Sequence, residues 1–394
     1  GKSKVLVDNI AVLYDKGAIR GALIIAPKGV YKNWDEIEFP VHLPDHVEHT
    51  KVLWEPNITK RKQMELDTLF DGKDDLKVLI MNVEAFSTTK GLDFAHSFLN
   101  IFLGKALIGI DESTTIKSPT AKRTKNILKI GELAKYRRIL TGSPVTKSPL
   151  DLYTQCKFLD PYHLDEDSYY AFRARYSNMV KRNFGGRSVQ LVVSYRRLDE
   201  LAKKLEKFSY RVLKEDCLDL PPKVFTKRIV ELSDEQKKMY LTMKNAAIAE
   251  QDGKVMSSMS ALTTLLRLHQ ITCGTFKADD GTLTPIKNNR ITALMDCLEE
   301  TDGKVIIWAT YREDIKNIVE SLKKAYGDAS TVEYHGGVDS TLRQKQIALF
   351  QQKNGPTRYF VGNPSTGGYG ITLTAANTVI YYSNNYDLEK RLQS

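Results

Sequence analysis

The chain has 394 residues, of which 42% are hydrophobic and 27% are charged, and its apolar runs fall well short of the ~20 residues that a membrane-spanning helix needs. This composition excludes a membrane-spanning helix and indicates a folded chain too long for one hydrophobic core, so we expect two domains. The 58 Lys and Arg residues exceed the 48 Asp and Glu residues by 10, which suits a polyanionic partner without identifying one.

The chain opens on Gly1-Lys2-Ser3, which matches the last residues of a phosphate-binding loop of the form Gly-x-x-x-x-Gly-Lys-Ser/Thr. In such a loop, backbone amides surround the phosphates, the Lys neutralises the terminal ones and the hydroxyl binds Mg²⁺. The tripeptide alone is a weak signal, because it also occurs by chance at helix starts; its other glycines are expected upstream. A helix is predicted to follow, since the next apolar residues have helical spacing: Val5, Leu6, Val7 and Ile10.

Short apolar runs then alternate with longer helical patterns, which predicts parallel β-sheets covered by helices on both faces. The first series of runs comprises residues 22–26, 51–54, 78–81, 106–110 and 139–140. The second series comprises residues 305–309, 332–334, 359–361 and 379–382. We therefore predict an α/β fold with two mostly parallel sheets.

Between the two series the pattern becomes helical and charged. One apolar stripe is predicted from helical spacing; its members are Leu198, Leu201, Ala202, Leu205 and Phe208. Pro221 and Pro222 stop a helix and stiffen an extended link, so the crossing between domains is placed near them. The predicted organisation is a first sheet domain over residues 1–160, a helical insertion and linker over 161–222, and a second sheet domain over 223–394.

Two adjacent carboxylates, Asp111 and Glu112, close the buried run at 106–110. In a nucleotide-hydrolysing α/β domain, a carboxylate at such a strand end holds Mg²⁺ and its neighbour orients or deprotonates the attacking water. The alternative is an acidic helix cap, because Ser113 and Thr114 follow. The buried strand before the pair and Lys2 upstream favour catalysis, with Asp111 and Ser3 as the metal ligands.

Three further segments carry polar residues whose roles the pattern leaves open. Thr141, Gly142 and Ser143, before Pro144, are predicted to link nucleotide state to domain movement, although a plain turn explains the same residues. A basic stretch either binds phosphates or forms a solvated helix face; it contains Lys117, Lys122, Arg123 and Lys125. Residues 367–374 join a flexible loop to a polar helix start, which suits a phosphate contact or a simple strand-to-helix turn.

Cysteine and histidine patterns indicate no further site. The four cysteines form no Cys-x-x-Cys pair, so neither a zinc site nor a disulfide framework is predicted, and a reducing compartment fits best; they are Cys156, Cys217, Cys273 and Cys297. His42, His46 and His49 have helical spacing, but Pro44 interrupts them, which favours solvated loop histidines.

Taken in order, these motifs resemble the superfamily two helicases, and most closely the Swi/Snf-type branch of DNA-dependent ATPases. The stretches that carry the resemblance span nearly the whole chain; they are residues 22–34, 111–117, 140–144, 150–153, 158–161, 220–223, 265–270 and 367–376.

The resemblance implies two RecA-like lobes with ATP and Mg²⁺ in the cleft and duplex DNA across both. Lys28 and Ser87 are the implied DNA-backbone contacts of the first lobe. Thr372 and Thr374 are those of the second lobe, and Gly370 is implied to approach the nucleotide together with Gly1, Lys2 and Ser3.

The chain departs from the family pattern at two places. Thr114 replaces the His or Asp usual at the fourth position of the carboxylate motif, a position that often couples hydrolysis to nucleic acid. The family's arginine fingers are expected beyond Ser394, and Arg391 precedes the matching positions, so it is not assigned that role.

The leading hypothesis from sequence is an ATP-dependent DNA translocase or helicase. A nucleic-acid-binding module with an incomplete or inactive ATPase site is the alternative from another class, and an unrelated P-loop kinase or GTPase ranks last because it leaves the second sheet unexplained. The chemistry places the protein in the cytoplasm of a bacterium or phage-infected cell, or in the nucleus of a eukaryote.

Overall fold

The computed structural model describes residues 1–184, 187–217, 219, 222–249, 258–277, 281–367, 371, 373–385, 387 and 391. The chain divides into two compact units, Gly1–Asp219 and Leu220–Ser394. None of the helices within the described ranges has both the length and the apolar composition needed to cross a membrane.

The first unit is built on a five-stranded parallel sheet with the order β2-β3-β1-β4-β5. The strands are β1 (Gly21–Ala26), β2 (His49–Leu53), β3 (Leu76–Asn82), β4 (Ala106–Ile110) and β5 (Tyr136–Ile139). Every residue of β1, β3 and β4 is buried, which explains the continuous apolar runs at 22–26, 78–81 and 106–110. The edge strand β5 is only partly buried and begins three residues before the apolar pair that predicted it.

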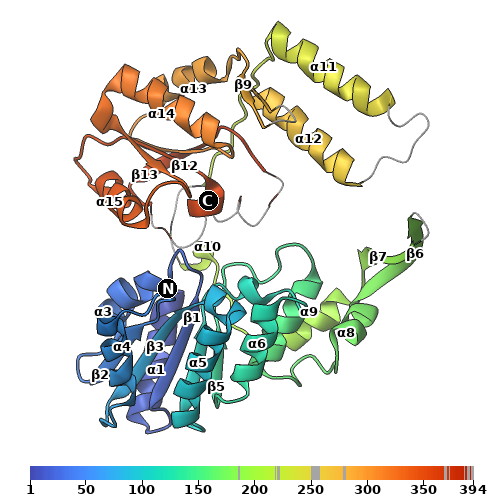
Figure 1. Ribbon diagram of the computed structural model, residues 1–394. Helices are drawn as coiled ribbons and strands as arrows, with labels where there is room; N and C mark the ends of the chain where they lie inside the picture. The colour runs from blue at the N-terminus through green and yellow to red at the C-terminus, as the bar shows by residue number, and fades with distance from the viewer. Residues whose placement is uncertain are drawn as a thin grey trace. The chain divides into compact units, whose positions relative to one another are not determined.

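Helices cover both faces of this sheet, as Figure 1 shows. On one face, Leu6, Val7 and Ile10 of α1 (Lys2–Asp15) pack with Ala22 and Ile24 of β1. The other face takes the alternate β1 residues, packed against α5 (Thr89–Ile101) and α6 (Lys122–Gly131). The smaller helices are α2 (Tyr31–Asn33), the π-helix η1 (Trp34–Glu38), α3 (Phe39–His42), α4 (Lys60–Asp67), η2 (Thr68–Phe70), η3 (Val83–Ser87) and η4 (Ser113–Ile116).

The segment predicted as a helical insertion also contains a β-hairpin, β6 (Ser177–Phe184) paired antiparallel with β7 (Arg187–Tyr195). Its helices are α8 (Tyr169–Tyr176), α9 (Leu198–Glu206) and α10 (Lys214–Cys217); η5 (Pro149–Asp151) and α7 (Leu152–Leu159) precede them. The predicted apolar stripe is narrower than expected. Leu201 is buried and Leu205 and Phe208 pack against the same cluster, whereas Leu198 and Ala202 are exposed. The division at residues 160 and 222 stays a prediction.

The second unit contains a four-stranded parallel sheet with the order β11-β12-β10-β13. The strands are β10 (Lys304–Trp308), β11 (Thr331–Tyr334), β12 (Tyr359–Gly362) and β13 (Ala376–Tyr381). The other elements are α11 (Asp234–Ala249), α12 (Ser258–Cys273), β8 (Thr275–Lys277), β9 (Leu283–Pro285), α13 (Arg290–Glu299), α14 (Arg312–Tyr326), η6 (Asp328–Ser330), α15 (Ser340–Gln351) and α16 (Pro364–Gly367).

Alternate residues of β10 enter two cores on opposite faces of this sheet. Val305 and Ile307 pack with Ile315 and Ile318 of α14. Ile306 and Trp308 lie in a second cluster, which also contains Phe350 of α15. Two parallel sheets, each flanked by helices, confirm the predicted fold class.

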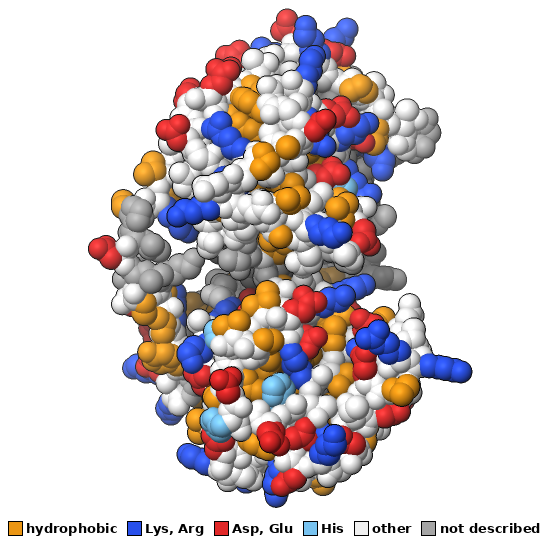
Figure 2. All heavy atoms as spheres, turned by 90° about the vertical axis from the view of Figure 1, so that its left-hand side faces the viewer, with side chains coloured by type: hydrophobic (Ala, Val, Ile, Leu, Met, Phe, Trp, Pro, Cys, Tyr) orange, Lys and Arg blue, Asp and Glu red, His pale blue; other side chains and the backbone are white. Residues whose placement is uncertain are grey.

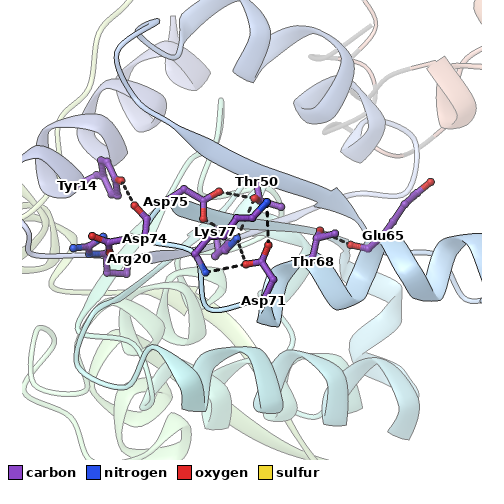
Figure 3. A network of polar contacts seen from close by, with 10 residues as sticks. Tyr14, Arg20, Thr50, Glu65, Thr68, Asp71, Asp74, Asp75 and Lys77 are labelled. Carbon is purple, nitrogen blue, oxygen red and sulfur yellow. Dashed lines mark hydrogen bonds and ion pairs between the residues drawn. The ribbon is translucent and has the colours of Figure 1, made fainter.

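A buried lysine lies at the amino edge of the first sheet, where β3 begins (Figure 3). Lys77 Nζ is 2.7 Å from carboxylate oxygens of both Asp71 and Asp75, and it donates a hydrogen bond of 3.1 Å to Thr50 Oγ1. Burial alone would lower the pKa of Lys77, but the hydrogen bonds to Asp71 and Asp75 raise it above its ordinary value. The bond from Lys77 also lowers the pKa of Asp71. The pKa shifts of Lys77 and Asp71 therefore both favour the ionised forms.

Candidate active site

The carboxylate pair lies at the carboxyl edge of the first sheet. The Asp111 N–H donates to Ile25 O at 2.8 Å, and the Ser113 N–H donates to Leu140 O at 3.0 Å, so the turn after β4 is tied to both neighbouring strands. Glu112 has a φ of 48°, in the left-handed region that non-glycine residues seldom adopt outside special sites. This backbone turn sends two successive carboxylates in different directions.

Both oxygens of the Asp111 carboxylate accept a hydrogen bond from an N–H group. The indole Nε1 of Trp34 is 3.0 Å from Oδ2, and the backbone N of Glu112 is 3.0 Å from Oδ1. Burial raises the pKa of Asp111 above its ordinary value; Trp34, Lys2 and the Glu112 N–H oppose that shift, and Glu38 adds to it. The carboxylate is thus held firmly, but its negative charge is incompletely compensated.

The structure brings Lys2 to this pair from the first turn of α1. Lys2 Nζ lies 2.9 Å from Glu112 Oε1, and the side chains are 44% and 15% exposed, so the ammonium remains accessible to a ligand. Gly1 caps the helix without a side-chain bond, and the first turn carries no acidic residue. The open N–H groups at this helix start suit an anion such as a phosphate. Ser3 lies half-buried in the same turn.

The predicted coupling segment lies beside Lys2. A Cβ added to Gly142 would be 3.9 Å from Lys2 Nζ, and the Ser143 N–H donates to Thr141 Oγ1 at 3.2 Å. Within the described part of the chain, Lys2, Asp111, Glu112 and the turn at 141–143 therefore form one cluster.

A buried glutamine joins this turn to the carboxylate motif. Gln155 Oε1 accepts a bond of 2.7 Å from Ser113 Oγ, and Gln155 Nε2 donates to Pro144 O at 2.9 Å. The sequence reasoning missed Gln155, and it included Trp34 only as the end of the stretch 22–34, without a role. The two contacts leave no local signal, because Trp34 and Asp111 are 77 positions apart and Gln155 and Ser113 are 42 apart.

Comparison with known families gives this site its context. The family model described as SNF2-related domain matches residues 2–276, and the helicase conserved C-terminal domain matches residues 287–394. The chain belongs to the SNF2-related family. It is a helicase-like ATPase core of that family, which confirms the resemblance to the Swi/Snf-type branch.

Several curated relatives are similar at low identity. "TATA-binding protein-associated factor MOT1" of Saccharomyces cerevisiae is 25% identical over 344 residues, which are 72% of this chain and 18% of that protein. "Putative ATP-dependent helicase/translocase YwqA" of Bacillus subtilis is 25% identical over 373 residues, covering 91% of this chain and 37% of the relative. The SNF2-related chain thus spans less than two fifths of the length of these relatives.

A solved structure is also similar over nearly the whole chain. It is described as "Sulfolobus solfataricus SWI2/SNF2 ATPase core in complex with dsDNA" and shares 23% sequence identity. The match covers 98% of the SNF2-related chain and 75% of that chain, with a TM-score of 0.42.

Two of the nucleic-acid-binding residues predicted in the SNF2-related chain share the carboxyl edge with Asp111. Lys28 is exposed in the turn after β1, and Ser87 is exposed at the end of η3, which follows β3. Because β1 lies between β3 and β4, Lys28 follows the strand next to β4 and Ser87 follows the strand beyond it, so both lie on one side of the carboxylates. In the second unit, Thr374 is exposed and its Oγ1 accepts from Gln351 Nε2 at 3.3 Å. Gly370 and Thr372 lie outside the described residues.

The basic stretch near the carboxylates is partly engaged within the SNF2-related fold. Lys117 Nζ donates to Thr146 Oγ1, and Arg123 Nε donates to Thr115 O at 3.0 Å. Lys122 and Lys125 are exposed on α6. These bonds favour a structural role for Lys117 and Arg123, which hold the segment after the carboxylate motif in place.

The carboxyl edge of the second sheet also carries a buried carboxylate. Asp314, near the start of α14, accepts a bond of 3.2 Å from Ser383 Oγ in the segment after β13. Burial raises its pKa to about 6, against the opposing effects of Arg290 and Ser383. None of the predicted site residues that the structure describes is among these contacts, and sequence reasoning did not identify this cluster.

Proposed function

We propose that the protein is an ATP-dependent DNA translocase, which couples ATP hydrolysis to movement along duplex DNA. One observation carries the proposal: Lys2 meets the adjacent carboxylates Asp111 and Glu112, more than a hundred positions later in the sequence, at the carboxyl edge of a parallel sheet. That edge is where α/β folds bind their ligands. Membership of the SNF2-related family supports the same chemistry.

Each residue of the cluster has a distinct proposed role. Lys2 and the N–H groups at the start of α1 would receive the terminal phosphates of ATP. A phosphate that takes Lys2 competes with Glu112 for the same ammonium, so phosphate binding frees the Glu112 carboxylate to orient or deprotonate the attacking water. Thr141, Gly142 and Ser143, beside Lys2, would report the state of the nucleotide to the rest of the lobe.

The donor set fits Mg²⁺, with Asp111 and Ser3 as the proposed ligands. Mg²⁺ is usually held by one or two carboxylates together with substrate phosphates. The described residues contain no cluster of three or more His, Cys, Asp or Glu side chains that could hold a metal on its own, which matches a site completed by the substrate. When bound, Mg²⁺ neutralises charge that develops on the phosphates during transfer.

For DNA, the proposed contacts are Lys28 and Ser87 in the first unit and Thr372 and Thr374 in the second. The first two follow strands on one side of β4, at the carboxyl edge that also carries the ATPase cluster, so a DNA strand held there would lie close to the hydrolysis site. On the face in Figure 2, basic and acidic side chains are interspersed, so the excess of 10 positive charges does not by itself mark a DNA surface there. We place this activity in the cytoplasm of a bacterium or phage-infected cell, or in a eukaryotic nucleus.

An ATPase assay with and without duplex DNA tests the proposal. DNA is expected to raise the rate severalfold, and Lys2→Ala is expected to abolish it. Lys4→Ala is the matched control, because Lys4 lies in the same helix turn but pairs with Asp8 at 2.8 Å. A rate indifferent to DNA would contradict the translocase.

Two further measurements separate the alternatives. A fluorescent ATP analogue that fails to bind would indicate a nucleic-acid-binding module with an inactive ATPase site. Unwinding of a fluorescent DNA fork would indicate a strand-separating helicase, whereas a translocase is expected to leave the fork paired.

A further inference from the structure

Trp34 makes a polar contact that its surroundings do not require. The side chain is 1% exposed and packs in the apolar cluster around α1, with its ring centroid 6.1 Å from that of Phe39. Its Nε1 nevertheless donates to Asp111 Oδ2 at 3.0 Å, across 77 positions of sequence. An indole N–H can only donate and an ionised carboxylate can only accept, so the direction of this bond is fixed.

A second tryptophan of the same unit shows that burial alone does not produce such a bond. Trp54 is 2% exposed and lies in the cluster on the other face of the sheet. Among the described residues, its Nε1 has no hydrogen-bond partner. The partner of Trp34 is therefore specific, while the core tolerates an indole N–H without one.

The position of Trp34 is set by packing rather than by the carboxylate. It is the first residue of the π-helix η1, and π-helical turns occur frequently at functional sites. The same segment begins at the turn after β1, where the Val30 and Tyr31 N–H groups both donate to Pro27 O. The indole is thus a fixed donor, against which the Asp111 side chain is oriented.

We propose that Trp34 is a positioning residue for the metal-binding carboxylate of Asp111. The proposal rests on the proposed function and deepens it. With Trp34 on Oδ2 and the Glu112 N–H on Oδ1, the carboxylate is held at two points, and its remaining lone pairs keep one orientation. Such a carboxylate binds a cation without first being reoriented, as ligands oriented by neighbouring groups do at other metal sites.

The test compares Trp34→Phe with Trp54→Phe. Both substitutions shorten a buried indole to a phenyl ring, but only the first removes a bond to Asp111. The measurement is the Mg²⁺ concentration that half-saturates binding of a fluorescent ATP analogue, without DNA or turnover. We expect this concentration to rise roughly ten-fold in Trp34→Phe, the usual size of a lost bond to a charged group, and to stay unchanged in Trp54→Phe. An equal Mg²⁺ dependence in the two variants would overturn the proposal.

A spectroscopic readout keeps the proposal testable if Trp34→Phe fails to fold. The chain has 3 tryptophans, so ¹⁵N-labelled indoles give a spectrum of few peaks that single Trp→Phe variants assign. In Asp111→Ala, the Trp34 indole N–H peak is expected to move while those of Trp54 and Trp308 stay in place. An unmoved Trp34 peak would show that the bond to Asp111 does not exist in solution.

These readouts separate the two proposals. If DNA fails to stimulate hydrolysis but the Trp34 peak moves and the Mg²⁺ requirement rises, translocation is wrong and the positioning role stands. If DNA stimulates hydrolysis and neither readout changes, the translocase stands and the role of Trp34 is wrong.

Discussion

Both edges of the first sheet carry buried charged residues, but their pKa values shift in opposite senses. The shifts at the amino edge favour the ionised forms, and the shift at the carboxyl edge disfavours the ionised form of Asp111. At the amino edge, Lys77 meets Asp71, Asp75 and the Thr50 hydroxyl, and the pKa shifts of Lys77 and Asp71 both favour the ionised forms. At the carboxyl edge, burial outweighs the partners of Asp111 and raises its pKa. The first cluster is satisfied within the fold, whereas the second leaves a carboxylate that a cation from outside would stabilise.

The amino edge also shows that a cavity is not sufficient for a site. A cavity of ≈ 260 Å³ opens there, lined by Arg20, Asp74, Asp75 and Lys77 among others. Arg20 is ion-paired with Asp74, and Lys77 with Asp75. These four lining charges are thus paired with one another, whereas the charge of Asp111 at the carboxyl edge is incompletely compensated.

The largest expected effect separates the two edges directly. Asp111→Asn is expected to reduce ATPase activity to background, because it removes the proposed Mg²⁺ ligand. Its free energy of unfolding is expected to change little, because the loss of a poorly compensated charge offsets the one N–H bond that the amide nitrogen cannot accept. Asp75→Asn makes the same change at the amino edge, where the carboxylate pairs with Lys77; it should lower stability and leave activity per folded molecule intact. Denaturant unfolding and steady-state ATPase assays measure both. If the two variants showed the same changes in activity and in unfolding free energy, the proposed difference between the two edges would be wrong.

The next effect concerns stability alone. Lys77→Met leaves Asp71 and Asp75 next to each other without their shared cation, and we expect it to cost about 2–3 kcal/mol, less than for a fully buried pair because solvent screens the exposed Asp71. Lys73→Met is the control, since Lys73 is exposed and lies 3.7 Å from Asp71 Oδ2. It should change the unfolding free energy by less than ~0.5 kcal/mol. Similar losses in the two variants would mean that the buried cluster adds no stability.

Sequence reasoning succeeded where a buried strand, or a group of adjacent functional residues, leaves a pattern within a short stretch of sequence. Strands β1, β3 and β4 are buried on both faces and so contain continuous apolar runs, which in β3 cover residues 78–81 between Lys77 and Asn82. It was less accurate at β5, where an exposed edge admits Arg137 and Arg138 into the strand. The β6–β7 hairpin was missed although Val189, Leu191 and Val193 alternate with other residues, because a helical pattern was assumed for the whole insertion.

The residues of the candidate site also divide into those that could be predicted from the sequence and those that could not. Lys2, Asp111 and Glu112 could be predicted because a phosphate-loop tripeptide and a carboxylate pair are contiguous in sequence. The role of Trp34 could not, since its bond to Asp111 joins residues 77 positions apart and depends on tertiary structure. The roles predicted for Lys28, Ser87 and the turn at 141–143 stay predictions.

A smaller effect is expected at Gln155, whose two hydrogen bonds connect Ser113 of the carboxylate motif to Pro144 of the following turn. Gln155→Leu leaves the buried Ser113 hydroxyl without its acceptor and Pro144 O without its donor, which should cost about 1–2 kcal/mol and slow ATP hydrolysis. Thr154→Val is the matched control: it removes a bond of 2.6 Å to Ile116 O from the neighbouring buried residue but does not touch the turn at 141–144. Reduced stability with full activity in Gln155→Leu would mean that the connection is structural only.

The smallest effect extends the comparison to the second sheet, whose carboxyl edge holds Asp314. Because burial raises the folded-state pKa of Asp314 to about 6 from an ordinary 3.8, the folded state binds a proton between these values while the unfolded state does not. Stability of this unit should therefore rise as the pH falls from 7 to 5, by about 1 kcal/mol, which is the sign opposite to that of a salt-bridged carboxylate.

Unfolding of the second unit can be followed by Trp308 fluorescence in a Trp34→Phe, Trp54→Phe background, since Trp308 is then the remaining tryptophan. Asp314→Asn should remove the rise in stability between pH 7 and 5, because the amide does not titrate. Asp328→Asn, in η6 away from the cluster, controls for the loss of one charge. If stability still rises between pH 7 and 5 in Asp314→Asn, another titrating group causes the rise. If the stability of the parent instead falls as the pH decreases from 7 to 5, the charge of Asp314 is compensated within the fold, as that of Asp71 is at the amino edge.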